Sequence, residues 1–81
     1  MPIETAWKAR FSRLWNTSEK TVGTDRALAH ERVLVALEAY RQVAALPGWP
    51  GPAALGRVAG VHADTASRVM AALRADGAHA P

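Results

Sequence analysis

The sequence predicts an all-α protein of four helices, and three observations support this prediction. Apolar residues recur every three or four positions along most of the chain, which is the period of a helix buried on one side. No segment alternates apolar and polar residues as a half-buried strand does. Proline and glycine gather between the periodic segments, where they separate one helix from the next. We expect a core of three helices and, before it, an amphipathic helix rich in aromatic residues.

Residues 3–15 are predicted to form this N-terminal helix. The segment holds two of the three Trp and the only Phe of the chain, so a short element carries a large apolar surface. These side chains either complete the core of their own chain or form the interface of a homodimer. The candidate interface residues are Trp7, Phe11, Leu14 and Trp15.

A polar loop is expected over residues 16–24, with Thr24 or Asp25 as the cap of the next helix. That helix, over residues 25–46, has two apolar stripes and is therefore predicted to be the central helix of the core. Glu38 and Arg41 lie three positions apart on it, within reach of a surface ion pair.

Three prolines between residues 47 and 52 exclude a helix there, and Trp49 among them is expected to cover the edge of the core. Residues 52–77 then predict two short helices, the first beginning at Pro52. Gly60 forms the turn between them, because glycine adopts the left-handed backbone that a Cβ disfavours. The inner stripe of the second helix is Ala66, Val69, Met70 and Leu73, and Gly77 ends it.

The segment Ala59-Gly60-Val61, followed by Thr65-Ala66-Ser67-Arg68-Val69, resembles the helix-turn-helix of bacterial DNA-binding regulators. In that pattern Leu55 is the first core anchor and Gly56 the small residue where the two helices touch. A winged helix would need two further strands, but only four residues follow Gly77, so we expect a wingless relative.

The resemblance implies that the second helix of the pair enters the major groove of double-stranded DNA. Arg68 is the best candidate for reading guanine or phosphate, because its guanidinium can donate two hydrogen bonds. Asp64 is expected to cap the helix rather than to read a base, and His62 either contacts phosphate or is merely solvated. The candidate DNA-binding residues are Arg57, His62, Ala63, Asp64, Thr65, Ser67, Arg68 and Ala71.

Composition sets wider limits on function. The net charge is +3, with eight Arg among ten basic residues, which permits an acidic partner. The chain has no Cys, its three His are scattered, and no catalytic or phosphate-cradling motif occurs, so we expect no enzyme activity, no metal and no cofactor. No long apolar run predicts a signal peptide or a membrane span, and a cytoplasmic location is expected.

The leading prediction is thus a DNA-binding transcriptional regulator. The outward face of its second motif helix has few long side chains, which favours two copies acting as a homodimer. The alternative is a protein–protein interaction module that uses the aromatic N-terminal helix to hold a protein partner.

Overall fold

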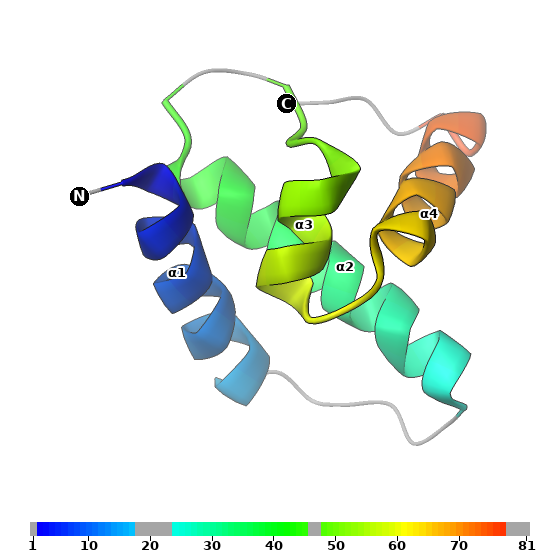
Figure 1. Cartoon of the computed structure of the whole chain (residues 1–81), viewed down its shortest axis with the longest axis horizontal. Coiled ribbons are helices and arrows are strands. Elements are labelled where there is room, and N and C mark those ends of the chain that lie inside the picture. Colours follow the sequence, from blue (N-terminus) through cyan, green and yellow to red (C-terminus); the bar gives the residue numbers. More distant parts are fainter. Residues whose placement is uncertain (1, 18–23, 46–47, 78–81) are drawn as a thin grey trace.

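The computed structural model describes residues 2–17, 24–45 and 48–77, and these ranges contain four helices and no strand. The all-α class is therefore confirmed. The helices are α1 (Ile3–Thr17), α2 (Asp25–Val43), α3 (Pro52–Ala59) and α4 (Ala63–Ala75). In Figure 1, α2 passes behind α3, while α1 and α4 lie on opposite sides of α3. Within the described ranges α1 packs on α2 and α3 and makes no contact with α4.

The helix boundaries follow local chemistry. Thr24 caps α2 as predicted, its hydroxyl accepting a hydrogen bond from the amide of Ala27 at 3.2 Å. Two boundaries differ from the prediction. α1 continues to Thr17 instead of ending at residue 15. The Thr17 hydroxyl donates a hydrogen bond to the carbonyl of Arg13, one turn earlier, at 3.0 Å. α2 ends at Val43 because Ala44 already has extended backbone; the predicted end at residue 46 lies outside the described residues.

The connection between α3 and α4 is a tight turn of three residues. Gly60 has the predicted left-handed conformation, with φ of +74°, and its amide donates to the carbonyl of Gly56 at 2.9 Å. Val61 donates to the same carbonyl at 3.0 Å and is half-buried against the core. The cap of α4 corrects the prediction. His62 rather than Asp64 serves as the N-cap, because its Nδ1 accepts from the amide of Asp64 at 3.1 Å.

The hydrophobic core draws on all four helices. α1 contributes the two buried aromatic side chains, so it belongs to the core instead of flanking a core of three helices. Trp49 packs against the edge of this cluster, as expected. The buried apolar residues of the described ranges are Trp7, Phe11, Val33, Ala36, Ala39, Leu55, Val58, Ala59, Ala66, Val69 and Met70.

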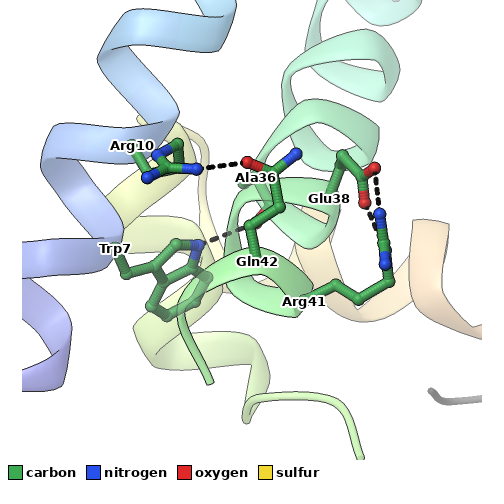
Figure 2. Close-up of polar contacts among 6 residues, drawn as sticks. All are labelled: Trp7, Arg10, Ala36, Glu38, Arg41 and Gln42. Atoms are coloured by element: carbon green, nitrogen blue, oxygen red, sulfur yellow. Dashed lines mark hydrogen bonds and ion pairs between the residues drawn. The ribbon is translucent and has the colours of Figure 1, made fainter. Parts of the chain in front are cut away.

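Trp7 joins α1 to the middle of α2. Its indole Nε1 donates to the carbonyl of Ala36 at 2.7 Å (Figure 2). Its ring also meets that of Tyr40 edge-on, with centroids 4.9 Å apart. A second contact joins α1 to α2, where the Arg10 side chain donates to Gln42 (Figure 2). Within α2, the predicted ion pair of Glu38 with Arg41 is present at 2.6 Å.

Burial revises the expectation for a dimer interface. Trp7 and Phe11 are only 2% and 4% exposed, covered by other helices of the same chain, and so offer no surface to a second copy. Leu14 and Trp15 are half-buried against the same core. Of the two interpretations of the aromatic stripe, the structure supports completion of the chain's own core for Trp7 and Phe11.

Arg32 connects α2 both to α1 and to the turn between α3 and α4. Its Nε donates to the carbonyl of Ala59, the last residue of α3, where a cation also complements the helix dipole. Its guanidinium lies 5.2 Å from the centre of the Phe11 ring and 4.9 Å from that of Trp15, within the range of cation–π attraction. The Arg32 side chain therefore links α1, α2 and α3.

Candidate nucleic-acid interface

α4 presents one side to the core and the opposite side to solvent. Three of its residues are buried, and four of the predicted contact residues on this helix are exposed and share the outer side. Two further candidates, Ala63 and Thr65, are half-buried at the border between the sides. The exposed contact residues are Asp64, Ser67, Arg68 and Ala71. These four side chains form a shallow surface, and Arg68 is the one long cation among them.

The N-terminus of α4 is organised by His62 and Asp64. Since Nδ1 of His62 accepts the amide of Asp64, that nitrogen carries no proton in this geometry and Nε2 carries it instead. The Asp64 carboxylate lies 3.6 Å from the same Nδ1. The two groups would form an ion pair only if Nδ1 carried a proton, and the cap would then be lost. With the cap formed, the Nε2–H of His62 is the donor left for a ligand.

Arg57 is held by α1 and is not brought to Arg68. Its Nε lies 2.8 Å from Oε1 of Glu4, and α1 has no contact with α4 among the described residues. The hydrogen bond from Arg57 holds the pKa of the Glu4 carboxyl below its ordinary value of 4.5. Both side chains are largely solvent-exposed, so water screens the pair and its contribution to stability is small.

A groove of about 220 Å³ lies between the N-terminal half of α2 and α4. Thr65 and Arg68, two of the predicted contact residues, form its α4 side, and Arg26 and His30 form its α2 side. Sequence reasoning missed the latter two. Their spacing of four, which places them on the same side of α2, was the available signal. The complete lining is Arg26, His30, Thr65, Arg68, Val69 and Ala72.

The arginines of the described ranges fall into two groups. Five are already engaged by other parts of the chain: Arg10 by Gln42, Arg32 by Ala59, Arg41 by Glu38, Arg57 by Glu4 and Arg74 by the ring of Trp49. The side chains of the remaining three, Arg13, Arg26 and Arg68, make no hydrogen bond or ion pair with another described residue, nor does the side chain of His30. Three of these four partnerless basic groups line the groove beside α4.

No group of three His, Asp or Glu side chains in the described ranges is placed to hold a metal ion. None of the helices described is long and apolar enough to cross a membrane. Comparison with known proteins gives no match: no family model fits the chain, and no curated protein or solved structure is significantly similar to it.

Proposed function

We propose that this chain is a DNA-binding transcriptional regulator in which α3 and α4 act as a helix-turn-helix and α4 enters the major groove. The observation that carries the proposal is the uncompensated positive charge beside the exposed face of α4, contributed by Arg68 and Arg26. A basic surface next to a projecting helix is the electrostatic feature of proteins that bind the phosphate backbone.

The exposed residues of α4 suit this role in different ways. Arg68 donates to guanine or to phosphate, and the hydroxyls of Ser67 and Thr65 donate to phosphate oxygens. Ala63 and Ala71 are small enough for the helix to approach the base edges closely. His62 offers its Nε2–H to a phosphate, and Asp64 can accept from the amino group of cytosine.

A homodimer belongs to the same proposal, because a single α4 with one long cation among its predicted contact residues reads few bases. Two copies would read two half-sites about one helical turn apart. With Trp7 and Phe11 buried, Leu14 and Trp15 are the predicted interface residues that retain exposed surface. Sedimentation at high concentration checks this, and a mass that stays at the 8.6 kDa of one chain argues against it.

The rival function, a protein-interaction module built on the aromatic helix, has less support. Its two main aromatic anchors, Trp7 and Phe11, are turned into the core and cannot reach a partner without unfolding α1. For a transcriptional regulator of bacterial type we propose a cytoplasmic location, where the chromosome is accessible.

The proposal is tested by fluorescence anisotropy with labelled duplexes of mixed sequence. Affinity should fall steeply as salt rises, because bound phosphates release counterions. Arg68→Ala should weaken binding about fivefold to tenfold at 0.1 M salt, the effect of losing one backbone contact. Arg13→Ala, which removes the same charge from α1, is the control and should bind nearly as wild type does. Absence of any binding by the wild-type chain at low salt would refute the proposed function.

A further inference from the structure

We infer that the groove between α2 and α4 is a phosphate-binding site, and that its ligand is a backbone phosphate of the DNA strand beside α4. The inference rests on the proposed function and adds to it a second set of DNA contacts, made by Arg26 and His30 of α2. Neither residue belongs to the α3–α4 pair.

Charge is the first argument. Arg26 and Arg68 come together from two helices with His30 beside them, no acidic side chain lines the groove, and neither arginine is neutralised by another described residue. Elsewhere in these ranges five arginines have a partner within the chain. Like charges assembled without a counter-charge repel one another, and an anion in the groove would relieve that repulsion.

The donors are of the right kind. Arg26 and Arg68 each present several N–H groups in a planar fork that matches phosphate oxygens. The Thr65 hydroxyl and an imidazole N–H of His30 supply neutral donors beside them. Arg26 and His30 are one helical turn apart on α2, and Thr65 and Arg68 are about one turn apart on α4, so the donors face one another across the groove.

Size and lining argue for a short segment of backbone instead of an enclosed small molecule. The volume of about 220 Å³ is below the range of roughly 300–1,000 Å³ found for pockets that enclose drug-sized ligands. Val69 and Ala72 give the groove an apolar part against which the sugar next to a phosphate can pack. A phosphate held from both helices would fix the angle at which α4 meets the duplex.

The test compares Arg26→Ala, His30→Ala and Arg13→Ala with the wild type, after circular dichroism has shown that each variant is folded. Anisotropy is measured on two labelled duplexes of unrelated sequence over a range of salt. If the groove holds a phosphate, Arg26→Ala weakens binding about fivefold to tenfold at 0.1 M salt on both duplexes and lowers the salt slope by about 0.9. His30→Ala weakens both by a smaller factor, and Arg13→Ala changes neither appreciably.

Two outcomes overturn the inference while leaving DNA binding intact. One is wild-type affinity and slope in both groove variants. The other is an equal loss in Arg13→Ala, which would show that net charge matters and not the groove. A second readout separates the inference from the proposed function: titration with inorganic phosphate, followed by NMR of the Arg26 and Arg68 side chains. If the Arg26 and Arg68 resonances shift with phosphate but no duplex binds, the DNA-binding proposal is refuted and the phosphate site remains. If the resonances do not shift and no duplex binds, both the phosphate site and the DNA-binding proposal are refuted.

Discussion

At Gly56 the backbone of α3 comes so close to the turn that no side chain fits. A Cβ at this position would lie 2.7 Å from the carbonyl oxygen of Val61 and 3.3 Å from the amide nitrogen of Ala63. Both are backbone atoms of the segment that begins α4, so they cannot move aside without shifting that helix. Gly56 therefore sets how closely α4 approaches α3.

Gly56→Ala should destabilise the protein, although alanine is the better helix former. Forcing one methyl group into closely packed backbone costs about 1–3 kcal/mol, which exceeds the gain of about 0.5–1 kcal/mol in helix propensity. Urea unfolding followed by circular dichroism measures the difference. Gly51→Ser is the matched control, since nothing lies within 4 Å of a Cβ there and a serine N-cap should leave stability equal or slightly higher. Equal stability of Gly56→Ala and wild type would contradict this reading of the contact.

Residues whose role is set by local backbone geometry were predictable from the sequence. Gly60 as the left-handed turn, Thr24 as a cap and Pro52 as a first helical residue all depend on neighbours within a few positions. Arg32 was not predictable in its role, because its partners Ala59, Phe11 and Trp15 come from two other helices. The predicted Asp64 cap was wrong because the helix already begins at Ala63, and the ring nitrogen of His62 just before it accepts the amide of Asp64.

Among the elements, α1 shows what the spacing of apolar residues can predict and what it cannot. Its apolar stripe predicted a helix correctly but left open what covers that stripe, since a monomer core and a dimer interface require the same spacing. Burial of Trp7 and Phe11 against α2 and α3 answers this for two of the four residues. The polar contact of α1 with α3, between Glu4 and Arg57, is not visible in any local pattern.

That contact makes the junction of α1 and α3 sensitive to acid. The pKa of Glu4 is lowered in the folded chain, chiefly by the hydrogen bond from Arg57. A carboxyl with a depressed pKa stabilises the fold above its unfolded pKa, and this contribution is lost as the pH falls through the folded value. We therefore expect the contact to be fully formed above about pH 5 and to disappear at lower pH, at a small cost in stability because both groups are exposed.

NMR titration of the side-chain carboxyl carbons checks this. In Arg57→Ala the midpoint of Glu4 should move up toward 4.5, while that of Glu38, lowered by its own hydrogen bond from Arg41, should stay where it is. An unchanged Glu4 midpoint would show that the two side chains are not paired in solution.

For the whole molecule, the important point is that the α3–α4 pair does not stand on its own. Leu55 and Val58 of α3 share one core with Trp7 and Phe11 of α1, so removing α1 exposes the inner side of the motif. The motif was the most recognisable part of the sequence, yet it depends on the segment farthest from it along the chain.

Deletion of residues 1–17 should abolish cooperative folding. Truncating one buried Phe or Trp to Ala typically costs about 3–5 kcal/mol, and the deletion removes two such side chains from a domain near the lower limit of size. Thermal unfolding by circular dichroism should show a broad, non-cooperative transition. Ile3→Ala, which alters a side chain that is 50% exposed on the same helix, is the control and should unfold like the wild type. A sharp transition in the truncated chain would contradict the shared core.

The candidate site was predictable only on the side that α4 provides. The resemblance to a helix-turn-helix implied that Asp64, Ser67, Arg68 and Ala71 face outward, and all four are exposed. The α2 side of the groove required the packing of α2 against α4, because Arg26 and His30 are far from Arg68 in the sequence. The same limit applied to Arg57, whose ion pair with Glu4 joins α3 to α1, two helices far apart in the sequence.

The fit between Gly60 and Arg32 has a consequence for how this sequence can diverge. A Cβ at position 60 would lie 2.8 Å from Nη2 of Arg32, so another residue there would require the guanidinium to shift from the place where it bonds the carbonyl of Ala59. Asn and Asp are the side chains that best tolerate a left-handed backbone. In related sequences we expect Asn or Asp at position 60 to appear together with a shorter residue at position 32, and arginine at 32 to accompany glycine at 60. The two positions should evolve as a pair, although 27 residues separate Arg32 from Ala59, its hydrogen-bond partner next to the turn.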